Sequence, residues 1–426
     1  MKQLRNIIET NKVLFKNFTS LSILQLTNYL FPLITLPYLV RVLGPEKYGL
    51  VMFVLSFTSY WGILIDYGFN LSATKYVSIF REDNNKLSEQ FSTVFFARVV
   101  LFGFSILVFG LLIIFFPLFN ENLELYIISI TGLIGTILFP TYLFQGIEKM
   151  HHILIINFII RSISVVAIFT FIRDSSDFVI LIFIYSATNI LIGITGFRTA
   201  VHKYNIRLFY PGIASTKDIL VNSFNIFISS LSISIISNSN AFILGLFAGS
   251  KMVGYFAAAD KIRLAFQSAL LPLLTTMFAR INKTAKDSLN RFNEITMKFF
   301  LVIFLAALLL SIILFSISPL LVEVLLGDSF TDSIKILNIL SPLPILFAIS
   351  NFIGVIILIP LGKENEYSRI MFATLIFHTL LSLLIVPLFL SEGSAIAAVA
   401  TELFLILLFV LYLYKNKNQI KLFNNW

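Results

Sequence analysis

The stretch FFLVIFLAALLLSIILFSISPLL, residues Phe299 to Leu321, indicates the fold class of this chain. It holds no charged side chain over a length that, at about 1.5 Å of helix rise per residue, crosses the roughly 30 Å hydrocarbon core of a bilayer. In lipid, a helix satisfies all the backbone polar groups of such a segment internally. We therefore predict a membrane-spanning helix here and search the chain for others.

The composition agrees with a membrane protein. The chain has 426 residues, of which 58% are hydrophobic and 12% charged, and its mean hydropathy is +0.92. These values lie outside the range of soluble globular domains. The absence of cysteine excludes disulfides, thiolate metal sites and cysteine nucleophiles. The adjacent His151 and His152 would point to different faces of a helix, so we predict no metal site.

Apolar runs long enough to span a bilayer recur along the whole chain. We predict an all-α integral membrane protein with about twelve spans. These are Phe18–Val40, Gly49–Tyr67, Phe91–Phe116, Leu125–Gln145, Ile153–Ile172, Phe178–Phe197, Phe224–Phe247, Val253–Ala279, Phe299–Leu321, Ile336–Pro360, Ile370–Leu390 and Ser394–Tyr414. The first is too long for a signal-peptide core and lacks a small-residue cleavage site, so it is predicted to be retained.

The second span has two interpretations. It either stops at Tyr67, where Asp66 would cap a helix end, or continues to Phe80 as a helix of about 32 residues with Asp66 near mid-membrane. We favour the long helix, because residues 71–80 carry little turn chemistry.

The distribution of basic residues predicts the orientation. With a cytoplasmic amino terminus, 22 of the 31 Lys and Arg residues lie in inner tails and loops, 5 in outer loops and 4 in the membrane. This asymmetry obeys the positive-inside rule, and an even number of spans places both termini in the cytoplasm. The basic charge is thus a topology signal, and we expect no nucleic-acid partner.

A weak internal repeat divides the chain near its midpoint. Gly44 and Gly49 bracket the turn after the first span, as Gly249 and Gly254 do after the seventh; likewise, Gly146-Ile147-Glu148 and Gly362-Lys363-Glu364 close the fourth and tenth spans. We predict two parallel six-helix bundles. The predicted parts are an amino-terminal tail (1–17), a first bundle (18–201), a basic cytoplasmic linker (202–223), a second bundle (224–414) and a carboxy-terminal tail (415–426).

Seven ionisable residues lie inside or at the ends of the predicted spans. They are Asp66, Arg98, Arg161, Asp260, Lys261, Arg263 and Glu402. Facing lipid, they would together cost roughly 20 kcal/mol, at about 2.5 to 3.5 kcal/mol for each charge at a helix centre. We therefore expect them to face the protein interior. Four cations against three acids favour an anionic cargo over a cationic one.

The cluster Asp260-Lys261-Ile262-Arg263 is the strongest candidate site. Arg263 lies about 60° from Asp260 around a helix, as an i,i+3 pair, and Lys261 lies about 100° to the other side. Asp260 can thus neutralise Arg263 and leave Lys261 to bind phosphate; the alternative is a structural salt bridge between helices. Glu402 either carries a proton or pairs with a basic group. Arg98 either snorkels to the headgroups or serves the site, and Arg161 lies near the middle of its span.

Four stretches carry a resemblance to a known family: VLGPEKYG (42–49), DYGFNLSAT (66–74), FPTYLFQGIEKM (139–150) and GYFAAADK (254–261). With these motifs the chain resembles, over essentially its whole length, the Wzx-type O-antigen and polysaccharide-unit flippases of the multidrug/oligosaccharidyl-lipid/polysaccharide exporter superfamily, whose fold is MATE-like. Tyr142 stands where that family usually has Trp, which puts a packing contact in doubt.

The resemblance implies two six-helix bundles around a cationic cavity, in the inner membrane of a bacterium. The implied activity is translocation of an undecaprenyl-pyrophosphate-linked oligosaccharide from the cytoplasmic to the outer leaflet by alternating access. It implies substrate contacts for Lys261 and also for Arg98, Arg161 and Arg263. Membrane lipids, a polysaccharide polymerase and a chain-length regulator are the further partners to expect.

Asp66, Asp260 and Glu402 are candidates for charge partners or for binding a coupling ion. No cofactor is expected, and H+ or Na+ coupling stays open. One rival function is a multidrug cation antiporter on the same fold, which would want an acid-dominated cavity. The other is a membrane enzyme of polysaccharide assembly, a polymerase or glycosyltransferase; no acid/base site or large extramembrane loop supports it, so we predict that the chain is not an enzyme.

Overall fold

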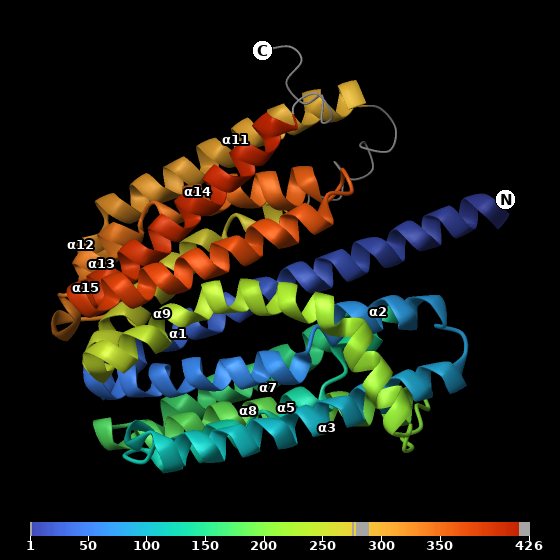
Figure 1. The fold of residues 1–426 in the computed structure, drawn as a ribbon, viewed down its shortest axis with the longest axis horizontal. Coiled ribbons are helices and arrows are strands. Elements are labelled where there is room, and N and C mark those ends of the chain that lie inside the picture. The colour runs from blue at the N-terminus through green and yellow to red at the C-terminus, as the bar shows by residue number, and fades with distance from the viewer. Residues whose placement is uncertain (1, 275–276, 278–288, 417–426) are drawn as a thin grey trace. The chain divides into compact units, whose positions relative to one another are not determined.

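The computed structural model describes residues 2–274, 277 and 289–416, and all regular secondary structure in these ranges is helical (Figure 1). Nine helices in the described part are long and apolar enough to cross a membrane. Three of them, at 57, 62 and 52 residues, are long enough to cross it twice, so the count is compatible with twelve spans. The predicted all-α membrane class is confirmed.

The three longest helices bend sharply at single residues. Helix α1 (Lys2–Asp66) bends at Gly44, with φ 69° and ψ 173°. Helix α9 (Ile213–Ser268) bends at Gly249, with φ 76° and ψ 172°. Helix α15 (Glu364–Lys415) bends at Leu390. Glycine adopts such positive φ values readily. The kinks at Gly44 and Gly249 lie where the sequence predicts the turns between the first and second spans and between the seventh and eighth spans.

The prediction that the second helix continues to Phe80 without a break is wrong, because two residues interrupt it. Helix α1 ends at Asp66, and Tyr67 and Gly68 both have positive φ before α2 (Phe69–Ile79) begins. Packing within the first unit accounts for the break: the Tyr67 ring stacks on Phe227 at 4.3 Å, and a Cβ at Gly68 would lie 2.8 Å from the side chain of Ile226. Local sequence carries no sign of either contact.

Helix α3 begins where Asp83 accepts hydrogen bonds from the backbone of residues 85 and 86. One side of α3 exposes large apolar residues at helical spacing, namely Val100, Phe104, Leu107, Leu111 and Ile114, as expected of a lipid-facing surface.

The helices from here to the linker are α3 (Asn84–Phe115), α4 (Leu123–Thr131), α5 (Ile134–Leu138), α6 (Thr141–Gly146), α7 (His151–Phe171) and α8 (Phe178–Arg198). The fourth predicted span is therefore three short helices, interrupted at Pro140.

The second half has a similar series. Its helices after α9 are α11 (Leu289–Ser316), α12 (Ser318–Leu325), α13 (Ser333–Leu340) and α14 (Leu343–Asn351), followed by α15. The tenth predicted span is again broken, here at Pro342 between α13 and α14. The end of the eighth predicted span falls outside the described residues, except for Met277.

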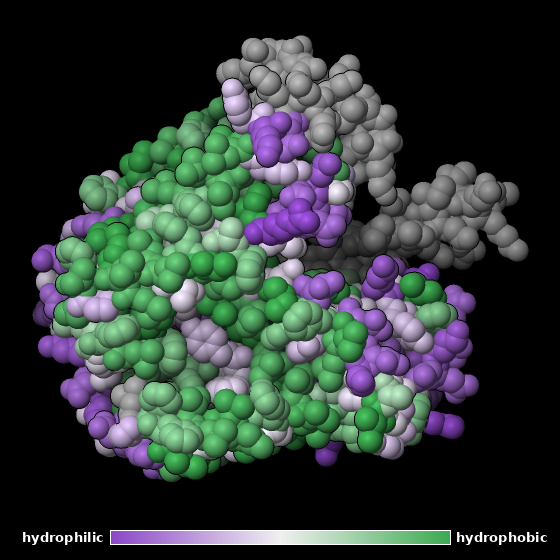
Figure 2. Space-filling view, viewed as in Figure 1, coloured by the Kyte–Doolittle hydropathy of each residue, from purple (hydrophilic) through white to green (hydrophobic). Residues whose placement is uncertain are grey.

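The chain divides into two compact units. Residues 53–234, with the start of the chain up to Phe31, form the first unit; Pro32–Met52 and the residues from Ile235 onward form the second. Each has its own apolar core, around Phe69 and Tyr142 in the first and around Ile356 and Phe409 in the second. Figure 2 shows hydrophobic side chains over the helices on this face and hydrophilic ones gathered at helix ends. The predicted bundle boundaries, 18–201 and 224–414, stay a prediction.

The two glycine turns of the internal repeat pack against each other within the second unit. A Cβ at Gly49 would lie 1.8 Å from the backbone oxygen of Ser250, and a Cβ at Gly254 would lie 2.0 Å from that of Pro45. The second repeat pair is offset from the sequence match. In these two turns, positive φ occurs at Glu148 and at Gly362. Each of them is followed by a lysine whose backbone N–H donates to the carbonyl five residues earlier. In the structure, Lys149 therefore corresponds to Lys363.

Candidate functional site

Arg98 lies buried in the first unit at the centre of a polar network. Its side chain is 2% exposed, and one terminal nitrogen lies 2.8 Å from a carboxylate oxygen of Asp66. The other donates to the carbonyl oxygens of Thr136 and Phe139, both at 3.0 Å. Arg98 is therefore held inside the protein and does not snorkel to the headgroups.

The helix break at Pro140 creates the acceptors for Arg98. Proline lacks an N–H, so the carbonyl four residues earlier, at Thr136, loses its helical donor. Phe139 is extended, with φ −80° and ψ 110°, as the residue before proline prefers. The guanidinium supplies hydrogen bonds to both carbonyls, and its centre lies 5.5 Å from the Tyr142 ring. Tyr142, which replaces the expected Trp, is thus a buried packing partner of Arg98.

Arg161 has a different environment, although it also belongs to the first unit. It is half-buried on α7, one helical turn from the buried Asn157 and Ser164. The residues that α7 exposes, among them Ile159 and Ile163, lie on another side of the helix. Arg161 has no hydrogen-bond or ion-pair partner among the described residues. Within the described part of the chain, it is a cation without an ion-pair partner on the inward side of a membrane helix.

In the second unit, Asp260 and Arg263 form the predicted i,i+3 ion pair. The Nε of Arg263 donates to Asp260 at 2.9 Å, and a second guanidinium nitrogen binds the same oxygen. A third hydrogen bond runs from Arg263 to Gln267 at 2.5 Å. The charge of Arg263 is thus largely balanced within α9.

Lys261 lies beside this pair and is not part of it. Its side chain is half-buried, and no hydrogen-bond or ion-pair partner for it occurs in the described ranges. Asp260 attracts it electrostatically, but an oxygen of that carboxylate is occupied by Arg263. Among the described residues of the second unit's polar core, Lys261 is thus a cation that no salt bridge holds.

Glu402 accepts a hydrogen bond from Ser350 of α14 and interacts electrostatically with Arg263. The second half of α15, which carries Glu402, is thereby connected to α14 and α9. Glu402 has a polar partner but no ion pair within 4 Å among the described residues. Its two sequence-based interpretations, proton carrier and charge partner, both remain predictions.

The sequence interpretation missed His378, which is completely buried in α15. Its ring nitrogens lie 2.7 Å from the hydroxyls of Ser239 and Thr401. Thr401 donates its own hydrogen to the backbone carbonyl of Ala397, so His378 donates to Thr401 and accepts from Ser239. His378 thus links α9 with both segments of α15. The available signal was a histidine near the middle of the predicted span Ile370–Leu390.

A family model and two curated proteins match this chain, and all three point to polysaccharide biosynthesis or O-antigen transport. Residues 14–285 match the family model described as polysaccharide biosynthesis protein. A protein of Escherichia coli (strain K12), provisionally named as an O-antigen transporter, is 31% identical over 96% of this chain and 99% of its own. A Shigella dysenteriae protein of the same name is 29% identical over 93% and 98%.

A solved structure gives the fold independently of sequence. The inward-facing structure of a multidrug resistance MATE family transporter of the MOP superfamily matches with a TM-score of 0.75 at 14% identity, over 92% of this chain and 96% of that one. At this identity the likeness speaks only for the fold. Together with the family match and the relatives, it shows that the chain belongs to the polysaccharide biosynthesis protein family and has the MATE-like fold of the MOP superfamily.

Proposed function

We propose that this chain translocates undecaprenyl-pyrophosphate-linked oligosaccharide repeat units from the cytoplasmic to the outer leaflet of a bacterial inner membrane. One observation carries the proposal. Of the seven ionisable residues in its membrane core, Arg161 and Lys261 have no hydrogen-bond or ion-pair partner in the part of the chain that the structure describes. The first unit holds Arg161 and the second unit Lys261, so the described part of each unit offers one cation whose side chain has no ion-pair partner.

A pyrophosphate fits this pattern of charges. Lysine binds phosphate as a point charge, and arginine can bind it through two hydrogen bonds. Two of the three acids of the core, Asp66 and Asp260, are paired with Arg98 and Arg263. The names of the relatives, which refer to O-antigen transport, favour an oligosaccharide as the group that the pyrophosphate carries.

The chain is a membrane transporter and not an enzyme. We propose that the cargo crosses by alternating access of the two halves, with no covalent step. Moving two negative charges outward across an inside-negative potential of ~100 mV is favourable by about 4.6 kcal/mol. Glu402, which lacks an ion-pair partner in the described ranges, is our candidate for coupling to H+.

The distribution of Lys and Arg places both termini in the cytoplasm in this proposal. A reporter at either terminus should then be accessible from the cytoplasm, and one inserted at Asn120 or Asp328 from outside. Opposite accessibility of the two termini would contradict an even number of spans. A polymerase and a chain-length regulator remain proposed partners.

The test of this function is complementation of a strain in which the gene is deleted. Wild-type protein should restore surface glycan, and Lys261→Ala should abolish it while membrane abundance stays normal. Lys261→Arg should retain more activity than Lys261→Gln, because charge matters more than an amide hydrogen bond at a pyrophosphate. Normal glycan display by Lys261→Ala would contradict the proposal, and parallel loss of abundance and display would indicate a structural lysine.

A multidrug cation antiporter is the weaker candidate. It rests on the fold likeness alone, and a cationic drug would meet the unpaired charges of Arg161 and Lys261.

A further inference from the structure

Three connections of the first unit border a pocket that is lined by none of the seven ionisable residues of the membrane core. They are the α2–α3 loop, the α6–α7 loop and the segment after α8, and the pocket has a volume of about 250 Å³. This is slightly below the range of small-molecule sites, roughly 300 to 1,000 Å³, so the pocket suits a headgroup better than a whole lipid. All three connections lie on the side that the positive-inside rule assigns to the cytoplasm.

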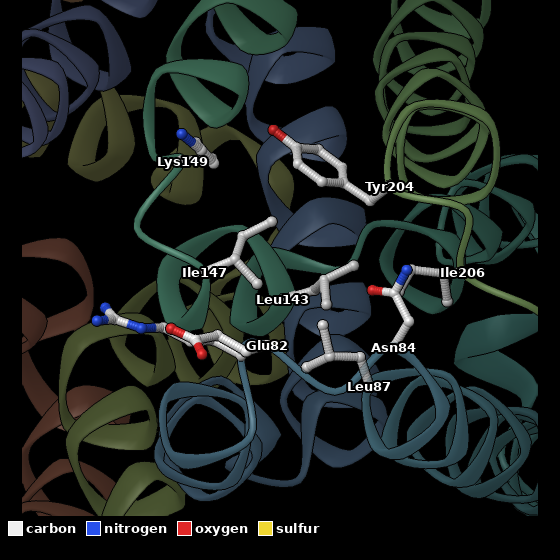
Figure 3. A pocket seen from close by; sticks show the side chains of 9 residues that line it. Glu82, Asn84, Leu87, Leu143, Ile147, Lys149, Tyr204 and Ile206 are labelled. Carbon is white, nitrogen blue, oxygen red and sulfur yellow. The ribbon is translucent and has the colours of Figure 1, made fainter.

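Two residues in left-handed conformation shape this pocket. Glu148 has φ 58° and Asn205 has φ 53°, values that are uncommon for residues other than glycine. The two neighbours of Glu148, which are Ile147 and Lys149, therefore both line the pocket, and so do the two neighbours of Asn205, which are Tyr204 and Ile206. The floor is apolar, with Leu143 and Ile206 buried. Figure 3 shows Leu143, Ile147 and Leu87 between the polar side chains.

The polar groups around this floor are of three kinds. Lys149 provides a cation and Glu82 a carboxylate, and neither side chain has a hydrogen-bond or ion-pair partner among the described residues. Neighbouring charges are occupied: Asp83 caps α3, and Arg81 lies 3.0 Å from Glu148. Tyr204 and Asn84 add a hydroxyl and an amide. Partial burial raises the pKa of Tyr204 above its usual value, so its hydroxyl stays protonated and can donate at neutral pH.

This set of groups suits a sugar joined to a pyrophosphate. Lys149 can bind the phosphate, whereas a site for phosphate alone would gain nothing from the carboxylate of Glu82 in its wall. Carboxylate, amide and phenol groups are the partners that sugar hydroxyls use for hydrogen bonds. The apolar floor can cover the carbon atoms next to the pyrophosphate. A cation, a hydroxyl-binding set and an apolar floor thus occur together in one pocket.

We propose that this pocket binds the sugar-pyrophosphate headgroup of the lipid-linked precursor at the cytoplasmic end of the first unit, before transport begins. The proposal rests on the proposed function for the identity of the precursor. It adds a loading site that is separate from the membrane charges Arg161 and Lys261.

The test measures binding to the purified full chain in lipid nanodiscs. An Arg161→Ala/Lys261→Ala background removes the unpaired membrane cations, so that the remaining binding reports the pocket. The probe is a C10-prenyl pyrophosphoryl-glucose. Lys149→Ala should weaken its binding roughly tenfold or more, as expected for loss of a charge-assisted contact. The matched control Lys203→Ala removes an exposed lysine next to Tyr204 that does not line the pocket, and should change binding less than about twofold.

Two further arms identify the ligand. Glu82→Gln should weaken binding of the glucose-bearing probe but not of C10-prenyl pyrophosphate without sugar. UDP-glucose should bind more weakly than the prenyl probe, because it has no isoprene chain for the apolar floor. Equal effects of Lys149→Ala and Lys203→Ala would overturn the site, and tighter binding of UDP-glucose would overturn the lipid-linked source.

Surface-glycan display by the otherwise wild-type chain separates this proposal from the proposed function. If wild-type protein restores display while Lys149→Ala binds the probe normally, only the pocket is disproved. If wild-type protein does not restore display at all, the proposed function fails, whatever the binding results.

Discussion

Arg98 and Lys261 are both cations of the membrane core, but their surroundings differ, and we expect them to have different roles. Arg98 has a carboxylate and two backbone carbonyls as partners, whereas none for Lys261 occurs in the described ranges. We therefore expect Arg98→Ala to lower the free energy of unfolding by about 3 kcal/mol, since it leaves Asp66 and two carbonyls without their donor. Thermal unfolding in detergent would measure this, with Lys261→Ala as the matched control.

The expected result is a lower melting temperature for Arg98→Ala and a nearly unchanged one for Lys261→Ala. Equal stability of the two variants would refute the structural role of Arg98. Such an outcome would return Arg98 to the substrate-contact role that the family resemblance implies.

Residue-scale contacts could be predicted from sequence only where they are local. The Asp260–Arg263 pair follows from their spacing on one helix. The Arg98–Asp66 pair and the contacts of Arg98 with residues 136 and 139 join different helices, and no periodicity encodes them. His378 could be seen as a membrane histidine, but its partners Ser239 and Thr401 lie 139 and 23 residues away.

At the scale of elements, the close approach of the two glycine turns is the feature most open to test. A Cβ at Gly254 would lie 2.0 Å from the backbone oxygen of Pro45, far inside van der Waals contact. We expect Gly254→Ala to force these turns apart and to reduce the amount of folded protein in the membrane, measured by size-exclusion chromatography of a fluorescent fusion.

Gly110→Ala is the control for this substitution. Gly110 lies within α3, and a Cβ there would meet nothing within 4 Å, so alanine should be neutral or slightly stabilising by its helix propensity. A folded yield of Gly254→Ala equal to that of Gly110→Ala would contradict the packing of the two turns.

The same elements show why the spans could be predicted and their interruptions could not. Hydropathy marks the lipid-exposed surfaces, such as that of α3, and therefore locates the membrane segments. The Tyr67–Gly68 break depends on contacts with residues 226 and 227 of α9. Pro140 and Pro342 were visible in the sequence, but proline also occurs within continuous helices, as Pro32 and Pro37 do within α1.

At the scale of the whole molecule, the proposed transport depends on a positive charge that remains in the membrane core after its ion pairs have formed. Asp66–Arg98 and Asp260–Arg263 are ion pairs, and in our proposal Arg161 and Lys261, whose side chains have no such partner among the described residues, give the transporter its preference for an anion. The proposal therefore predicts that selectivity depends on the cations that lack an ion-pair partner and not on the total number of charges.

The most direct test is translocation of a polyprenyl-pyrophosphate-linked oligosaccharide by purified protein in proteoliposomes, read as its accessibility to a glycosidase added outside. We predict that wild-type protein moves the lipid-linked oligosaccharide and that Arg161→Ala/Lys261→Ala, reconstituted to the same level, does not. Equal translocation by this variant, or translocation of an uncharged glycolipid as fast as that of the pyrophosphate, would contradict the account.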